Sequence, residues 1–180
     1  MKKYLSLIIR YLLILLIALP NLYIFYAIFT PLTIYPLYFI LKIFFDVSLS
    51  EATILLNGFQ IQIIKACIAG SAYYLLFALN LSTPNINIKQ RIKMLCFSFL
   101  SLLVLNVIRI FSMILLLFYG ASFFDATHKF FWYFVSTMLV VLIWFAGVRF
   151  FKIRQIPVYS DFNYLYKFSK NNSKNPKKNK

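Results

Sequence analysis

Long apolar runs separated by short polar stretches dominate the chain. A helix of about 20 apolar residues crosses the roughly 30 Å hydrocarbon layer of a bilayer. The pattern therefore predicts an all-α polytopic membrane protein with about four to six transmembrane helices. The clearest helical spans are expected at Ser6–Phe29, Ile68–Leu81, Met94–Tyr119 and Phe130–Phe150.

The stretch Pro31–Phe45 is also apolar, but it is short and is interrupted by Pro31 and Pro36. Proline lacks a backbone N–H and breaks or kinks a helix interior. A full crossing here would also change the even number of spans counted above. We therefore expect a re-entrant or interfacial helix on the outer side of the membrane.

The segment Ala52–Ile64 follows a different period. Asn57-Gly58 is a favoured two-residue hairpin turn because both positions tolerate a positive φ. The arm after it, Phe59–Ile63, alternates apolar and polar residues as a strand does. A short β-hairpin on the outer face is therefore expected to lead directly into the helix that carries Cys67.

The composition agrees with a membrane protein, since 62% of the residues are hydrophobic and only 13% are charged. A soluble domain of this length could not bury so much apolar surface. We expect a single integral membrane domain over residues 1–160, with no separate soluble catalytic domain. Residues 161–180, rich in Asn and Lys, predict a basic, disordered cytoplasmic tail.

The formal net charge of +15 could indicate nucleic-acid binding, but its distribution argues against it. Basic residues gather before the first span, between the second and third, and after the last. The positive-inside rule places these regions in the cytoplasm. We therefore expect a multi-pass protein of the cell membrane with both termini cytoplasmic. The first apolar run lacks a small-x-small cleavage site, which predicts a retained helix rather than a signal peptide.

Arg109 lies inside the span Met94–Tyr119. An ionised group in mid-membrane costs several kcal/mol, so it usually faces a protein interior or a wet cavity. Asn106, three residues earlier, lies on the same helical face. Two interpretations remain: a functional arginine, or a structural one that caps carbonyls of a neighbouring helix.

Cys67 stands at the expected outer start of the helix Ile68–Leu81. The free N–H groups and the dipole of a helix N-terminus stabilise a thiolate, and Lys65 adds positive charge. Gly70 would let another backbone or a substrate approach closely. The alternative is equally physical, because small residues form the usual packing face of membrane helices and buried cysteines are commonly inert.

His128 is the only histidine of the chain, and Asp125 would orient it if that turn is already helical. An interfacial histidine is otherwise an ordinary surface residue. Cys96, at the cytoplasmic end of its helix without polar neighbours, is expected to be structural. The two cysteines fall near opposite faces of the membrane, so no disulfide is expected, and no metal-ligand spacing such as Cys-x-x-Cys occurs.

A depth estimate links three of these residues. Cys67 and Arg109 each lie about 15 residues, or roughly 22 Å, from the inner end of their helices, and His128 lies just above them. The three side chains are therefore expected in one pocket open to the outer face. A nucleophile, a charge stabiliser and a base would suit such a pocket.

With these residues in place, the chain resembles the archaeosortase/exosortase family, and most closely its short archaeal members, the pacearchaeosortases. The resemblance covers about residues 20–161 and follows the family's order of Cys, Arg and His. Many members carry Ser-Gly directly after the cysteine, where this chain has Ile68-Ala69. The motifs are Ala66-Cys67-Ile68-Ala69-Gly70-Ser71-Ala72-Tyr73-Tyr74, then Asn106-x-x-Arg109-Ile110, then His128.

The resemblance implies a membrane cysteine protease/transpeptidase that acts on C-terminal sorting signals of exported proteins, each a motif, a transmembrane helix and a basic end. Cys67 would form a thioester acyl-enzyme, His128 would shuttle the proton, and Arg109 would stabilise the oxyanion. A membrane lipid or lipid-linked acceptor would release the product. No metal or organic cofactor is implied.

Two other classes of protein fit parts of the pattern. A non-catalytic subunit of a transport or assembly complex would use Arg109 to pair helices and leave Cys67 unreactive. A lipid-modifying acyltransferase could use a histidine and a membrane-embedded arginine, but its cysteine would be dispensable. Substitution of Cys67 by alanine separates these alternatives from the transpeptidase.

Overall fold

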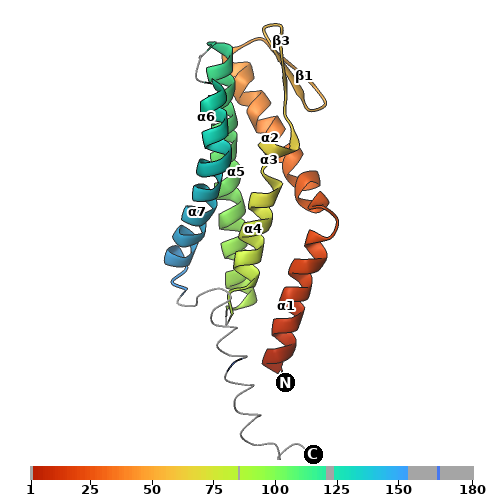
Figure 1. Cartoon of the computed structure of the whole chain (residues 1–180), viewed down its shortest axis with the longest axis vertical. Coiled ribbons are helices and arrows are strands. Elements are labelled where there is room, and N and C mark those ends of the chain that lie inside the picture. The colour runs from red at the N-terminus through yellow and green to blue at the C-terminus, as the bar shows by residue number, and fades with distance from the viewer. Residues whose placement is uncertain (1, 85, 121–123, 154–165, 167–180) are drawn as a thin grey trace, which may run out of the picture.

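The computed structural model describes residues 2–84, 86–120, 124–153 and 166. Helices make up most of the described chain, and one small antiparallel sheet interrupts them (Figure 1). The elements are α1 (Lys2–Ala18), α2 (Tyr23–Phe44), β1 (Val47–Ser50), β2 (Thr53–Leu56), β3 (Phe59–Gln62), α3 (Lys65–Ile68), α4 (Gly70–Leu81), α5 (Ile88–Phe118), α6 (Phe124–Phe130), the π-helix η1 (Phe131–Val135) and α7 (Ser136–Phe150).

Three helical stretches of the described chain are long and apolar enough to cross a membrane, namely Tyr23–Phe44, Ile88–Phe118 and Ala126–Phe150. The apolar stretches Leu5–Ala18 and Lys65–Leu81 are shorter. The structure thus agrees with a mostly helical membrane protein, whereas the number of four to six crossings stays a prediction.

The helices run along the long axis of the molecule (Figure 1). From the N-terminus, α1 and α2 lead toward the sheet, α4 leads back, α5 returns, and α6, η1 and α7 lead back again. The N-terminus and the α4–α5 connection therefore lie at one end, and the sheet lies at the other (Figure 1). Arg10 and Tyr74 fasten α1 to α4, since Arg10 donates to the Leu81 carbonyl at 3.2 Å and Tyr74 to the Ile14 carbonyl at 3.3 Å.

The predicted single helix Ser6–Phe29 is wrong, because the chain leaves the helix after Ala18 and resumes at Tyr23. Pro20 has no N–H to donate, and its ring would clash with the carbonyl four residues earlier. The break is completed by Asn21 and Leu22, whose φ values of 49° and 59° are left-handed. The helix interruption therefore falls at the first proline of the chain.

The predicted break at Pro31 and Pro36 is also wrong, because both residues lie inside the continuous 22-residue helix α2. A proline costs an interior helix about 3 kcal/mol. In apolar surroundings each backbone group left without a partner costs several kcal/mol, so unwinding the helix would cost more. Phe25, Phe29 and Leu37 of α2 are buried and hold it against the other helices.

The predicted hairpin is present as β2 and β3, which pair through Leu56 and Phe59 around the turn Asn57-Gly58. Both turn residues have a positive φ, 46° and 89°. A third strand, β1, which the sequence did not indicate, extends the sheet in the order β1-β2-β3. Ile54 and Leu56 are fully buried, so one sheet face packs on the helices.

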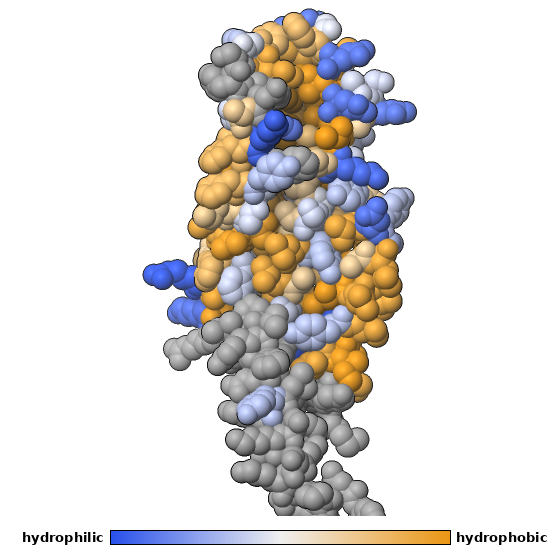
Figure 2. Space-filling view, viewed as in Figure 1, coloured by the Kyte–Doolittle hydropathy of each residue, from blue (hydrophilic) through white to orange (hydrophobic). Residues whose placement is uncertain are grey.

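The outside of the helices is apolar, which is the reverse of a soluble bundle. Phe39, Leu100 and Phe145 are 61%, 63% and 58% exposed. Hydrophobic residues predominate on the face shown in Figure 2. The predicted tail 161–180 lies outside the described residues, apart from Tyr166.

Candidate active site

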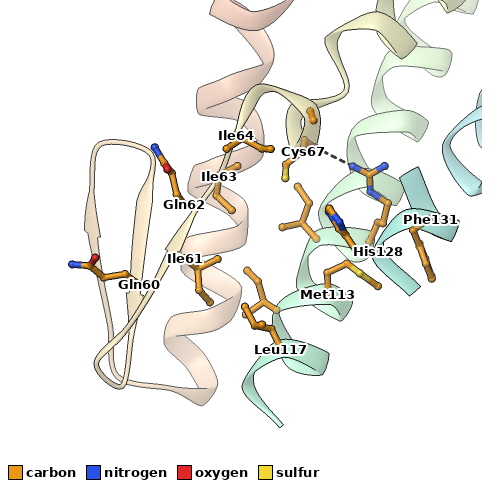
Figure 3. A pocket seen from close by; sticks show the side chains of 14 residues that line it. Gln60, Ile61, Gln62, Ile63, Ile64, Cys67, Met113, Leu117, His128 and Phe131 are labelled. Carbon is orange, nitrogen blue, oxygen red and sulfur yellow. Dashed lines mark hydrogen bonds between the residues drawn. The ribbon is translucent and has the colours of Figure 1, made fainter. Parts of the chain in front are cut away.

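A pocket of about 330 Å³ lies between β3, the turn α3 and the helices α5, α6 and η1. Cys67, Arg109 and His128 all line it. These residues come from three separate segments of the sequence, and the structure brings them to one cavity. Figure 3 shows the side chains of Cys67 and His128 directed into the pocket.

Cys67 is held in a single helical turn rather than at the start of the following long helix. Its N–H donates to the carbonyl of Ile64 at 2.9 Å. The turn ends at Ala69, whose φ of 60° is left-handed, and α4 begins only at Gly70. The expectation that free N–H groups of a long helix activate Cys67 is therefore wrong. The thiol lies instead on a bend between two helical segments, half-buried at the pocket wall.

Asn106 and Arg109 both donate to the backbone carbonyl of Cys67. The distances are 2.9 Å from Asn106 Nδ2 and 3.3 Å from Arg109 Nη2, the latter drawn as the dashed line in Figure 3. Asn106 also lies 3.5 Å from the carbonyl of Ile68. Because the bend at Ala69 deprives these carbonyls of helical partners, two side chains of α5 satisfy them instead. The main chain of Cys67 is thereby fixed.

Arg109 also donates through Nη1 to Ser136 Oγ at the start of α7. Ser136 in turn donates to the carbonyl of Phe131 at 2.9 Å, five residues earlier, which matches the π-helical spacing of η1. π-Helical turns are rare and often occur at functional sites. Ser136 was not found by sequence reasoning, since a serine within an apolar run gives no signal until its partner is known.

His128 lies on α6, and its half-buried side chain enters the same pocket as Cys67 (Figure 3). Asp125 is three residues earlier in the same helix, so the turn is helical as the proposed orientation of His128 requires. The side chain of Asp125 lies outside the described part of the chain. Its pairing with His128 therefore stays a prediction.

Tyr26 of α2 supports the bend from the other side. Its ring packs so closely on Gly70 that a Cβ there would lie 2.7 Å from the ring carbons. The close approach expected at Gly70 is thus made by an aromatic side chain of the same protein. Lys65 Nζ lies over the Tyr26 ring, 5.8 Å from its centroid. Tyr26, Asn106 and Arg109 together leave the Cys67 segment little freedom.

The rest of the pocket is mainly apolar. Ile110, Met113 and Ile114 of α5 line it, and Ile61 and Ile63 face it from β3 and the residue just after it (Figure 3). The strand alternation predicted at Phe59–Ile63 was the available signal for these two isoleucines. Apolar side chains lower the effective dielectric constant around the thiol and the imidazole, and this strengthens electrostatic interactions in the pocket.

Cys96 is exposed and lies outside this pocket. Among the described residues, no three side chains of His, Cys, Asp or Glu come together as a metal site would require. Comparisons of the chain with protein-family models, curated proteins and solved structures find no match. The chemistry of the site is therefore argued from its geometry: a thiol and an imidazole in one cavity, with a guanidinium beside the thiol's main chain.

Proposed function

We propose that this chain is a membrane cysteine protease/transpeptidase with Cys67 as the nucleophile. The observation that carries the proposal is that Cys67 and His128 enter one pocket while Arg109 holds the main chain of Cys67. Nucleophile, base and positioned donor are the parts that acyl transfer through a thiol requires. They come from separate segments, so chance clustering of neighbours in sequence does not produce them.

In the proposed reaction the Cys67 thiol gives its proton to His128 and attacks the carbonyl carbon of a peptide bond. The C–N bond then breaks, His128 returns the proton to the leaving amine, and a thioester to Cys67 remains. An acceptor nucleophile attacks the thioester and restores the thiol. Water as the acceptor gives proteolysis, whereas an amine or a lipid-linked group gives transfer.

Arg109 is proposed to stabilise the negative oxygen of the tetrahedral intermediate. A guanidinium has five N–H donors, and within the described residues two hydrogen bonds of Arg109 are accounted for. The same side chain is thus able to fix Cys67 and to offer a further donor toward the pocket that it lines. Its bonds to Ser136 and Cys67 set the plane of the guanidinium before substrate arrives.

The resemblance to archaeosortases and exosortases supports the same reaction. The family pattern of Ser-Gly after the cysteine would place glycine at the position of Ala69. Ala69 adopts a left-handed conformation with φ 60°, which glycine accepts without strain. The backbone at position 69 therefore has a conformation that a glycine adopts without strain, although this chain has an alanine there.

The proposed substrates are exported proteins that end in a sorting motif, a transmembrane helix and a basic tail. Cleavage would take place at the outer membrane face, with the termini of this chain in the cytoplasm. The pocket lies at the sheet end of the molecule, away from the N-terminus, as this orientation requires. The substrate helix would lie in the lipid beside the apolar exterior of the bundle.

One specific observation favours a non-catalytic subunit as the second candidate. The hydrogen bonds of Arg109 join α3, α5 and α7, which is also what a purely structural arginine would do. A lipid-modifying acyltransferase is the third class, and its activity would not need Cys67. Both rivals predict a dispensable thiol.

The test is processing of membrane-anchored exported proteins in cells that contain wild type, Cys67→Ala or, as the matched control, Cys96→Ala. We expect tail removal with wild type and Cys96→Ala and none with Cys67→Ala, at equal amounts of folded protein in the membrane. Processing by Cys67→Ala at the wild-type rate would overturn the proposal and favour the rivals.

A further inference from the structure

The strand β3 has an unusual position in the molecule, because it is both an edge strand and a wall of the Cys67 pocket. The sheet order β1-β2-β3 leaves one side of β3 without a strand partner among the described residues. Five consecutive residues, 60–64, line the pocket. Side chains alternate between the two faces of a strand, so every second side chain would line the cavity if side chains alone did so. Because five consecutive residues line it, the main chain of this segment also borders the cavity.

The register shows which backbone groups point to the open side. The N–H of Ile63 donates to the carbonyl of Ala52 at 2.9 Å, and Ile61 and Phe59 pair with Ile54 and Leu56 of β2. Hydrogen-bonded pairs alternate along an antiparallel ladder. The N–H and C=O groups of Gln60 and Gln62 therefore point away from β2, toward the free edge.

The two edge strands of the sheet, β1 and β3, differ in their position relative to the pocket. No residue of β1 lines the pocket, and β1 contacts helix α2, which it follows in the chain. β3 lacks the charged residues and the proline that commonly block pairing at an exposed edge, since its sequence is Phe59-Gln60-Ile61-Gln62. An uncovered, uncharged edge is a template for the addition of another extended segment. Cys67 follows only five residues after Gln62.

Resting on the proposed function, we infer that β3 binds the segment of the substrate just ahead of its transmembrane helix as an added strand. The substrate segment bonds through its main chain to Gln60 and Gln62, which delivers the scissile peptide to Cys67. Every second substrate side chain faces the pocket lined by Ile110, Met113 and Ile114, and those between lie on the same sheet face as the side chains of Gln60 and Gln62. The sheet thus selects substrates by extended shape and by alternate apolar residues rather than by charge.

Cross-linking tests this inference without any catalytic step. The protein carries Cys67→Ala, Cys96→Ser and Gln62→Cys, and the probe is a pool of single-spanning exported reporters. Each reporter has ten randomised residues with one cysteine ahead of an apolar helix of about 20 residues and a tetralysine tail. Opposed residues of neighbouring strands lie about 4.5–5.5 Å apart at Cα, which suits a disulfide. We expect disulfides at alternate positions of the randomised segment.

The matched control is Ser50→Cys in the same background. Ser50 pairs with Thr53, which pairs with Gln62, so it lies on the same sheet face at the same level but on the edge away from the pocket. Alternating cross-links with Gln62→Cys and none with Ser50→Cys support strand addition. Cross-links without a two-residue period, none at all, or equal cross-linking of both variants would overturn it.

A second measurement separates this inference from the proposed function. Gln60→Pro removes an edge donor while leaving the bonds to β2 intact, and Gln60→Ala removes only the side chain. We expect Gln60→Pro to process the reporter roughly 2- to 12-fold more slowly than Gln60→Ala, the value of one hydrogen bond. Equal rates for both variants would contradict strand addition but leave Cys67 catalysis standing, whereas failure of the proposed function shows as processing that persists in Cys67→Ala.

Discussion

Arg91 and Arg109 lie eighteen residues apart on α5, roughly five helical turns and about 27 Å along the same face. Both reach the segment formed by α3 and α4, and both donate to main-chain carbonyls there. Arg91 binds the carbonyls of Asn80, Leu81 and Thr83 at the end of α4. Arg109 binds the carbonyl of Cys67 at the other end.

Both arginines therefore hold main-chain carbonyls in place through hydrogen bonds, but their surroundings differ. Arg91 caps a helix end, the ordinary role of a basic residue at a C-terminus. Arg109 closes a bend and, in addition, lines a pocket together with a thiol and an imidazole. A half-buried arginine bonded to main-chain carbonyls is thus not by itself evidence of a catalytic role. Arg109 differs from Arg91 because it lines a pocket together with Cys67 and His128.

The largest effect is expected from matched substitutions of the two arginines. Lysine keeps the charge but is unable to hold two acceptors in the plane of a guanidinium. Arg109→Lys should lower turnover by a factor on the order of 10²–10³, the effect of losing an oxyanion donor. Turnover is measured on the folded fraction of purified protein with a reporter substrate.

Arg91→Lys should leave turnover of the folded fraction unchanged and lower stability by about 1.5–3 kcal/mol through weakened charged hydrogen bonds. Thermal unfolding in detergent measures that loss. If both lysine variants lost stability alone, the two arginines would be equivalent, and Arg109 would be a helix-packing residue.

Gly70 and Gly147 lie near these same two ends and differ in how closely other side chains pack on them. A Cβ at Gly70 would lie 2.7 Å from the Tyr26 ring, whereas a Cβ at Gly147 would lie 3.6 Å from Met94 Cε, an ordinary contact. Gly70→Ala should therefore destabilise the protein by about 1–3 kcal/mol and displace the Cys67 bend. Gly147→Ala should be tolerated.

The measurement is thermal unfolding together with the alkylation rate of Cys67 in a Cys96→Ser background. The double variant Gly70→Ala, Tyr26→Leu should recover stability, because the ring that causes the clash is gone. Equal behaviour of the two glycine variants would show that Tyr26 does not define the bend.

The smallest effect is expected from Asn106→Ala. It removes one hydrogen bond to the Cys67 carbonyl while the bond from Arg109 remains. Stability should fall by about 1 kcal/mol and turnover by less than roughly 12-fold. Ser98→Ala on the same helix is the control, since the buried Ser98 hydroxyl has no hydrogen-bond partner in the described structure. A larger loss in Ser98→Ala than in Asn106→Ala would contradict the assigned role of Asn106.

Features carried by local chemistry were predictable from the sequence. Asn57-Gly58 indicated the hairpin turn, and the depth of Cys67 and Arg109 indicated that the two would meet. Features that depend on tertiary contacts were not. Pro31 and Pro36 are accepted inside α2 because the packed helix outweighs their local cost, and the left-handed Ala69 has no sequence signal of its own.

Ser136 shows the same limit at the candidate site. The structural role of its hydroxyl is defined by two features: the arginine that donates to it and the π-helical turn that precedes it. Neither the partner nor the turn is visible in a sequence that reads as one apolar run over Phe130–Phe150.

The most direct test of Cys67 as the nucleophile is a trap of the covalent intermediate. Wild type and Cys67→Ala are purified from cells that export membrane-anchored proteins, and intact mass spectrometry is run before and after neutral hydroxylamine, which cleaves thioesters. We predict an added mass on wild type that maps to Cys67, disappears with hydroxylamine and is absent from Cys67→Ala. No added mass on wild type, with tails still processed in cells containing Cys67→Ala, would show that Cys67 is not the nucleophile.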